Sequence, residues 1–279
     1  MPDLSDIRRA YAERIAGSVG ITDAAVIEAF ATVPREVFLG DGPWLVHGGY
    51  TARRTSDPAA IYADVLVSLH LEKGINNGQP SLHARSIAEA APALGERVVH
   101  VGAGTGYYTA ILAQIVGTSG HVDAFEIEPS LAARASRNLA PWPQVTVHPA
   151  SALQEPLAVA DLIYVSAALT TIPVTWLDAL AIGGRLVLPL MPTGGTGHMW
   201  RIQRIDDIHY SARAFSTAVF IGCVGGQDAR ASDLLREALM RGEPERVRWL
   251  TRGSTPEADA WFVGDGWWMS AAEPQAGRG

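Results

Sequence analysis

From residue 97 onward, short apolar runs alternate with stretches of helical periodicity. The apolar runs predict strands at 97–101, 121–126, 144–148, 161–166 and 184–190. The stretches between them predict helices at 107–116, 129–139 and 173–181, with Gly183-Gly184 closing the last helix. Short strands alternating with helices of this length are typical of an α/β fold with a mainly parallel, doubly wound sheet. Two later runs, 199–205 and 214–224, predict antiparallel strands at its C-terminal edge.

The N-terminal part has a different pattern. Residues 5–33 predict two helices, the second of which is capped by Thr22-Asp23. The segment 40–60 is rich in Gly, Arg, Thr, Ser, Asp and Pro and predicts an irregular excursion. Residues 71–80 predict a polar loop, after which Pro80 opens a helix that runs to about residue 91.

The tail changes pattern again after the last predicted strand. Residues 228–251 predict one or two charged amphipathic helices, and 261–269 predict a short hairpin rich in tryptophan. The tryptophans suit either a lid or an anchor that holds the tail on the main domain, and we favour the anchor. We therefore expect three parts, namely an N-terminal helical segment with a loop, a Rossmann-like domain and a C-terminal extension, at 1–80, 81–225 and 226–279.

The composition narrows the class of protein. A chain of 279 residues with 48% hydrophobic residues can bury a sizeable core. The formal charge of −7 argues against broad binding to nucleic acid or to an anionic membrane. The N-terminus is too polar for a signal peptide, and the single Cys223 excludes an internal disulfide or a cysteine-based metal cluster. We expect a cytoplasmic protein without a membrane span or a metal site.

The most informative motif is the glycine loop that follows the first of these strands. Gly102-Ala103-Gly104-Thr105-Gly106 separates an apolar strand from a helical pattern. The dinucleotide fingerprint needs G-x-G-x-x-G, and a P-loop needs a following Gly-Lys-Ser/Thr, so neither fits. The spacing G-x-G-x-G is that of the S-adenosylmethionine loop of Rossmann-like methyltransferases. Glu126 ends the second strand, where an acid can accept hydrogen bonds from both ribose hydroxyls, and we favour it over its neighbour Glu128.

Several motifs in order along the chain carry a family resemblance. Val33-Pro34-Arg35-Glu36, Gly78-Gln79-Pro80, the glycine loop and Asp161 to Ser166 follow one another as they do in that family. Over residues 7–205 the chain resembles the protein-L-isoaspartate (D-aspartate) O-methyltransferase family. The resemblance implies a Rossmann-like fold and transfer of a methyl group from S-adenosyl-L-methionine to an isoaspartyl carboxylate. The chemistry mainly needs two aligned groups in a dry pocket.

The segment that the resemblance assigns to the acceptor departs from the family pattern. Gly78 replaces a serine that is thought to position the carboxylate in the family, and Asn76 replaces a threonine. Asn76 or Asn77 could supply a replacement donor, or both are simply turn residues, and the sequence leaves the two interpretations open. With Gln79, these residues form our predicted catalytic region.

Two further departures lie in the cofactor half. His100 stands where an acid often precedes the glycine loop, and we expect it to be a structural, hydrogen-bonded residue. Ser151 replaces an expected acid and could contact the adenine or cap a turn. The predicted cofactor-binding set is completed by Ser166 at the end of the fourth strand: Gly102, Ala103, Gly104, Thr105, Gly106, Glu126, Ser151 and Ser166.

The sequence does not decide between several classes of acceptor. The acceptor is either the isoaspartyl residue of damaged protein or a particular carboxylate on a peptide or small molecule. Gly78 slightly favours the second class. Arg53 and Arg54 in the excursion could grip a carboxylate, although a solvated surface loop is the interpretation we favour. A non-catalytic scaffold that keeps the fold is the alternative from another class.

Overall fold

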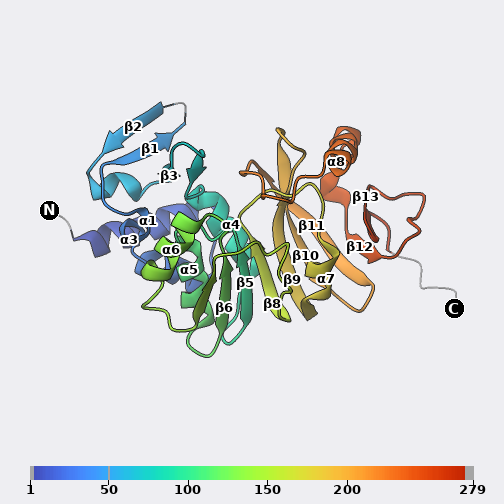
Figure 1. The fold of residues 1–279 in the computed structure, drawn as a ribbon, viewed down its shortest axis with the longest axis horizontal. Helices are drawn as coiled ribbons and strands as arrows, with labels where there is room; N and C mark the ends of the chain where they lie inside the picture. Colours follow the sequence, from blue (N-terminus) through green and yellow to red (C-terminus); the bar gives the residue numbers. More distant parts are fainter. Residues whose placement is uncertain (1–2, 50, 274–279) are drawn as a thin grey trace. The chain divides into compact units, whose positions relative to one another are not determined.

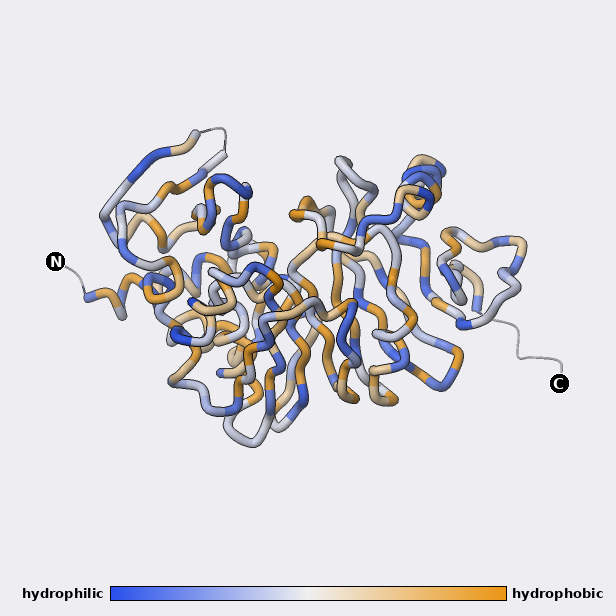
Figure 2. The backbone as a smooth tube through the Cα atoms, in the orientation of Figure 1, coloured by the Kyte–Doolittle hydropathy of each residue, from blue (hydrophilic) through white to orange (hydrophobic). Residues whose placement is uncertain are grey.

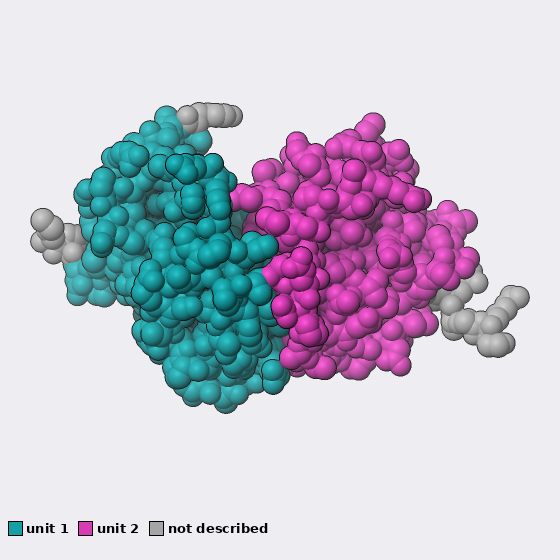
Figure 3. Space-filling model, in the orientation of Figure 1, with its two compact units in different colours: residues 1–150 teal, residues 151–279 magenta. Residues whose placement is uncertain are grey.

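The computed structural model describes residues 3–49 and 51–273, and it divides into two compact units, 1–150 and 151–279 (Figure 3). The three-part division at 80 and 225 stays a prediction, and its outermost residues, 1–2 and 274–279, lie outside the described part. No helix among the described residues has the length and apolar character needed to cross a membrane.

The first unit begins with the two predicted helices, α1 (Leu4–Val19) and α2 (Ala24–Thr32), and a short third, α3 (Arg35–Leu39) (Figure 1). Asp23 caps α2 as predicted, since its carboxylate accepts hydrogen bonds from the backbone N–H groups of Ala25 and Val26. The three helices precede a small sheet that carries the acceptor segment.

This small sheet corrects the prediction of an irregular excursion. Strands β1 (Trp44–Gly48) and β2 (Thr51–Thr55) form an antiparallel hairpin, and the sheet continues through β3 (Leu66–His70) to β4 (Ile75–Asn76) in the order β2-β1-β3-β4. A 3₁₀ turn, η1 (Pro58–Ile61), lies between β2 and β3. Strand β2 is an exposed edge with arginines at its centre, so its residues lack the apolar alternation by which a strand is recognised in a sequence.

The rest of the first unit follows the predicted alternation closely. Helix α4 (Pro80–Ala90) precedes three parallel strands in the order β5-β6-β7, with α5 and α6 as their connections (Figure 1). Their bounds are β5 Arg97–Val101, α5 Tyr107–Val116, β6 His121–Phe125, α6 Pro129–Asn138 and β7 Val145–His148. In parallel sheets, ligand-binding loops gather at the carboxyl ends of the strands, which here are followed by the glycine loop and Glu126.

The second unit contains one parallel pair of strands, and its other strand pairs are antiparallel. Strand β8 runs parallel to β9, and the order from there is β9-β10-β11-β12-β14-β13, with antiparallel pairs throughout. The bounds are β8 Ala160–Val165, α7 Val174–Asp178, β9 Leu180–Leu190, β10 Gly197–Arg204, β11 His209–Ala218, α8 Ala229–Arg241, η2 Pro244–Arg246, β12 Trp249–Arg252, β13 Phe262–Gly264 and β14 Trp267–Ser270. The antiparallel part of the sheet is therefore larger than the C-terminal edge that the sequence predicts. Apolar residues recur along β8 and β9 in Figure 2, and both strands are largely buried.

Two predicted boundaries in this unit are wrong. The helix predicted over 173–181 ends at Asp178, and Gly183-Gly184 lies inside β9, where the pairing with β8 shifts register. A Cβ on Gly184 would lie 2.8 Å from the carbonyl oxygen of Ala181, so this glycine serves a bulge and not a helix end. The strand predicted over 214–224 is β11, and residues 219–224 lie beyond it, with Val219 and Val224 exposed.

The tail anchor is confirmed within the second unit. Trp267 is fully buried, and its indole N–H donates to the carbonyl oxygen of Ile172 at 3.1 Å. The predicted hairpin around it is the pair β13 and β14.

One buried cation ties the first unit together. The side chain of Arg35 is fully buried and donates hydrogen bonds to the carbonyl oxygens of Ile61, Ala63 (3.1 Å) and Val65 (2.8 Å). The rings of Tyr11 and Tyr107 flank the guanidinium, with centroids 5.9 Å from its carbon. Arg35 thus fixes the start of β3, and through it the acceptor segment.

We expect Arg35→Met to lower the free energy of unfolding by about 3 kcal/mol, because three buried carbonyl groups lose a charged donor. Urea denaturation measures this effect. Arg9→Met is the matched control: Arg9 makes an exposed ion pair with Glu28, so its loss costs less than about 1 kcal/mol. Equal effects of the two substitutions would contradict the anchoring role.

Two buried histidines make the first unit sensitive to acid. His100 in β5 and His83 in α4 are 0% and 2% exposed, and burial lowers the pKa of each imidazole to about 3. His100 is a structural residue as predicted, with Nδ1 2.8 Å from Oγ1 of Thr109. Both imidazoles are therefore neutral in the folded protein at neutral pH.

We expect stability to fall between pH 7 and pH 5, since the unfolded chain takes up protons near pH 6.5 that the folded chain refuses. Each histidine contributes a loss of about 2 kcal/mol over this range. Urea denaturation of the parent and of His100→Asn at both pH values checks the sign and size. The variant should lose about half of the fall, and an unchanged fall would contradict the assignment.

Candidate active site

The glycine loop between β5 and α5 depends on three glycines in the left-handed region. Gly102, Gly104 and Gly106 have φ values of 77°, 59° and 97°. Other residues adopt such angles only with strain. At Gly106 there is no room either, because a Cβ would lie 2.7 Å from the Leu139 side chain. The result is a bare backbone loop at the start of α5, a geometry suited to a ligand that lies on the main chain.

Glu126 lies directly against this loop. Its Oε2 accepts a hydrogen bond from the N–H of Gly104 at 2.7 Å, and its Oε1 accepts one from the N–H of Glu128 at 2.9 Å. The side chain is nearly buried, and burial raises its pKa, while the backbone donors oppose that effect. A carboxylate has about four acceptor positions, so two remain for hydroxyl groups of a ligand.

Glu128, the competing acid, has a different role. It precedes α6, and its carboxylate forms an ion pair with Lys73 and accepts a hydrogen bond from Ser130. The structure therefore separates two acids that the sequence left as neighbours: one contacts the glycine loop, and the other is engaged with a lysine from the turn after β3. Thr105 is buried in the loop, where its carbonyl oxygen accepts from Asn138.

The two asparagines of the acceptor segment hold its backbone. Oδ1 of Asn76 accepts from the N–H of Gly78 at 2.9 Å, and Oδ1 of Asn77 accepts from the N–H of Val67 at 2.8 Å. Asn77 also donates its own N–H to the carbonyl oxygen of Val67. The two side-chain oxygens thus hold the turn at Gly78 and the contact of this segment with β3. The side-chain nitrogen of Asn77, Nδ2, is buried and has no hydrogen-bond partner among the described residues, which leaves a donor for a ligand.

Gln79 is fixed by a residue that the sequence analysis missed. Nε2 of Gln79 donates to Asp64 at 2.8 Å, and Asp64 also accepts from both the N–H and the hydroxyl of Ser81 at the start of α4. Asp64 therefore acts as the cap of α4 from a distance in sequence. Its place in the loop before β3 gave no sign of this contact.

His83 is the second residue that the sequence analysis missed, and it explains Gly78. A Cβ on Gly78 would lie 2.2 Å from Nε2 of His83, and Gly78 has φ +72°. The imidazole stacks on the ring of Tyr108 with centroids 3.7 Å apart. Tyr108, the second residue of α5, donates its hydroxyl to the carbonyl oxygen of Gly78 at 3.3 Å. The histidine fills the space into which a serine side chain at position 78 would point.

Ser151 and Ser166 lie in the second unit. Oγ of Ser151 accepts from the N–H of Leu153 at 3.3 Å, which is a turn cap. Ser166 directly follows β8 and is partly exposed. Their contact with a cofactor stays a prediction. In the described part of the chain, no group of three or more His, Cys, Asp or Glu side chains is arranged to hold a metal ion.

Known proteins of similar sequence point to one family. The model of the family described as Protein-L-isoaspartate(D-aspartate) O-methyltransferase (PCMT) matches residues 13–228. The chain is 34% identical over 230 residues to Protein-L-isoaspartate O-methyltransferase 2 of Marinobacter nauticus, which covers 80% of this chain and 95% of the relative. A relative from Archaeoglobus fulgidus, Protein-L-isoaspartate O-methyltransferase 1, is 33% identical over 210 residues, covering 74% and 88%.

Solved structures support the predicted α/β methyltransferase fold. A protein-L-isoaspartate O-methyltransferase superposes with a TM-score of 0.64 at 22% identity, covering 82% of this chain and 69% of that one. A putative protein-L-isoaspartate O-methyltransferase from Plasmodium falciparum, in complex with S-adenosyl-L-homocysteine, also gives 0.64 at 19% identity, covering 77% and 97%. At these identities the likeness concerns the fold. From the family match and the sequence relatives, the chain belongs to the protein-L-isoaspartate(D-aspartate) O-methyltransferase family and is an S-adenosyl-L-methionine-dependent O-methyltransferase.

Proposed function

We propose that the chain methylates a carboxylate of a peptide, a protein or a small molecule at the segment Asn76 to Gln79. The observation that carries the proposal is the hydrogen bond from Tyr108 to the carbonyl oxygen of Gly78. Tyr108 belongs to the helix that the glycine loop opens, so the bond supports an acceptor segment close to the donor side of the site. A transfer reaction needs this proximity.

The residues of the first unit fit the cofactor. The bare loop Gly102–Gly106 offers N–H groups at the start of α5, and Glu126 keeps acceptor positions for ribose hydroxyls. Thr105 and Ala103 belong to the same loop. Ser151 and Ser166 stay in the proposed cofactor-binding set.

When bound, S-adenosyl-L-methionine supplies a sulfonium methyl group, which an ionised carboxylate oxygen attacks to give a methyl ester and S-adenosylhomocysteine. The chain therefore needs no general base. Its residues orient the two partners and exclude water. Nδ2 of Asn77 is the buried donor that we assign to the acceptor carboxylate, while Gly78 and Gln79 shape the backbone around it.

The acceptor is tested directly with labelled S-adenosyl-L-methionine. We compare an isoaspartyl peptide, its normal aspartyl twin and a small dicarboxylic acid. Label on the isoaspartyl peptide alone supports a repair enzyme, and label on either other substrate supports a dedicated carboxyl modification. Cofactor binding with no label on any carboxylate would instead favour the scaffold alternative.

We expect Glu126→Gln to weaken binding of S-adenosyl-L-methionine by about 2 kcal/mol, or roughly thirtyfold, because the amide loses the charge that accepts the ribose hydroxyls. Titration calorimetry measures the dissociation constant. Glu128→Gln is the matched control, since Glu128 pairs with Lys73, and it should change the constant by no more than about threefold. The reverse order of effects would give the cofactor role to Glu128.

We expect Gly78→Ser alone to destabilise the protein by about 2 kcal/mol, because the new side chain overlaps His83 and the backbone is left-handed there. Combining it with His83→Ala removes the overlap. If a serine at position 78 confers isoaspartyl specificity, methylation of the isoaspartyl peptide rises in the double variant and not in Gly78→Ser or His83→Ala alone.

Urea denaturation and the labelled-methyl assay, run on all three variants, separate folding from specificity. A double variant that folds but gains no isoaspartyl activity removes position 78 as the determinant.

A further inference from the structure

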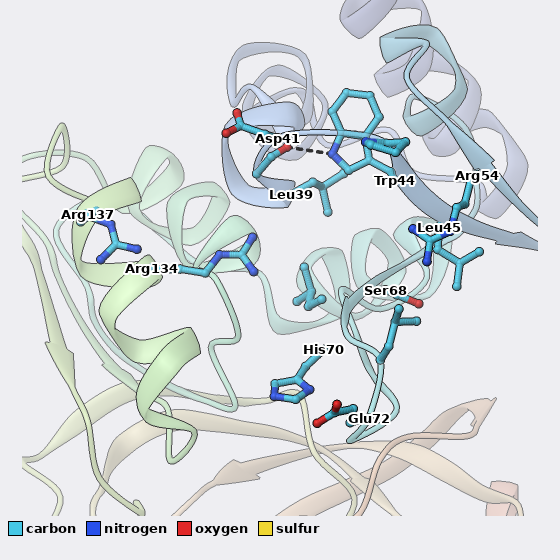
Figure 4. Close-up of a pocket in the computed structure, with 14 residues that line it drawn as sticks. Leu39, Asp41, Trp44, Leu45, Arg54, Ser68, His70, Glu72, Arg134 and Arg137 are labelled. Carbon is cyan, nitrogen blue, oxygen red and sulfur yellow. Dashed lines mark hydrogen bonds between the residues drawn. The ribbon is translucent and has the colours of Figure 1, made fainter.

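A cavity of about 740 Å³ lies in the first unit, between α6 and the β1–β2 hairpin (Figure 4). It is bordered by the stretch from Leu39 to Leu45, by the end of β3 and its following turn, and by two arginines of α6. None of the predicted cofactor residues lines it. The hairpin β1–β2, which the sequence analysis took for an irregular excursion, contributes Arg54.

The cavity is rich in cationic side chains. The ionisable groups that line it are Arg54, His70, Arg134, Arg137, Asp41 and Glu72. In Figure 4, Arg134 reaches from α6 into the space between the helix and the hairpin, while Asp41 and Glu72 lie at its edges. Three guanidinium groups and two carboxylates thus line the cavity.

The three arginines also lack ionic partners. Within residues 3–49 and 51–273, none of Arg54, Arg134 and Arg137 forms an ion pair. The hydrogen bond from Arg134 to the carbonyl oxygen of Phe38 is long, at 3.4 Å. Burial, and next the charge of Arg137, lower the pKa of Arg134. An anion would relieve this repulsion.

The cavity adjoins the donor site through one side chain. Leu69 lines the cavity, and its Cδ1 lies 3.6 Å from where a Cβ on Gly104 would stand. The glycine loop is therefore only one side chain away.

We propose that this cavity binds acidic side chains of the acceptor, so that the preferred substrate is a peptide with Asp or Glu near the methylated carboxylate. The proposal rests on the carboxyl methyltransferase function and names its substrate class. Arginine suits the role, because its planar guanidinium binds carboxylates through two parallel hydrogen bonds. The overall charge of −7 makes a nucleic acid the less suited anion.

The test is a binding measurement that does not depend on turnover. Two fluorescent isoaspartyl peptides are compared by anisotropy with S-adenosylhomocysteine present, one with flanking Asp and Glu, the other with Asn and Gln in their places. We expect the acidic peptide to bind roughly tenfold more tightly, and salt to reduce the difference.

Variants then place the preference in the cavity. Arg134→Gln and Arg54→Gln should each reduce the preference for the acidic peptide by about threefold to tenfold. Arg54 lies on an exposed edge strand, so its variant keeps the test valid if Arg134→Gln folds poorly. Arg230→Gln, an exposed arginine of α8, is the matched control and should leave the preference unchanged.

The outcomes test peptide binding in the cavity separately from methyl transfer. Equal binding of the two peptides, or a preference that survives in both arginine variants, overturns the proposal even if methyl transfer occurs. A preference that the variants abolish, without methyl transfer to either peptide, supports the cavity and refutes the carboxyl methyltransferase function. Stronger binding of a single-stranded oligonucleotide than of the acidic peptide would also overturn it.

Discussion

The buried guanidinium of Arg35 is the constraint on which the rest of the first unit depends. A fully buried charge needs hydrogen-bond acceptors, and here the carbonyl oxygens of Ile61, Ala63 and Val65 accept from the two terminal nitrogens of the guanidinium. Its Nε has no hydrogen-bond partner among the described residues. Those carbonyls lie immediately before β3, whose end lines the basic cavity and whose Val67 holds Asn77. The position of the acceptor segment is thus set by a charge on α3, which holds the backbone before β3.

Glu36, the next residue of the same motif, reinforces this arrangement. It accepts hydrogen bonds from Arg8 and from the hydroxyl of Tyr62, and that hydroxyl also accepts from the backbone N–H of Arg35. The motif Val33-Pro34-Arg35-Glu36 therefore joins α1, α3 and the loop before β3. The motif has a positioning role, because it brings distant segments together and takes no part in the reaction.

The sequence predicted the parts of this protein that rest on local pattern. The parallel strands, the cap at Asp23 and the placing of Glu126 against Gly104 follow from apolar runs, capping chemistry and glycine spacing, which act within a few residues. The sequence did not predict the hairpin β1–β2, because an exposed edge strand carries no apolar alternation. The contacts of Asp64 and His83 escaped because each depends on the course of the loop around Gln79, which local pattern does not encode.

The two halves of the candidate site therefore differ in how well the sequence motifs explain them. On the donor side, the glycines and Glu126 form the contact that the motif implies. On the acceptor side, the space that a side chain at position 78 would enter is filled by the imidazole of His83, stacked on Tyr108. The imidazole keeps this part of the core densely packed. The acceptor segment is thus a repacked structure with its own shape, and the basic cavity beside Leu69 is the nearest feature able to give that shape a preferred substrate.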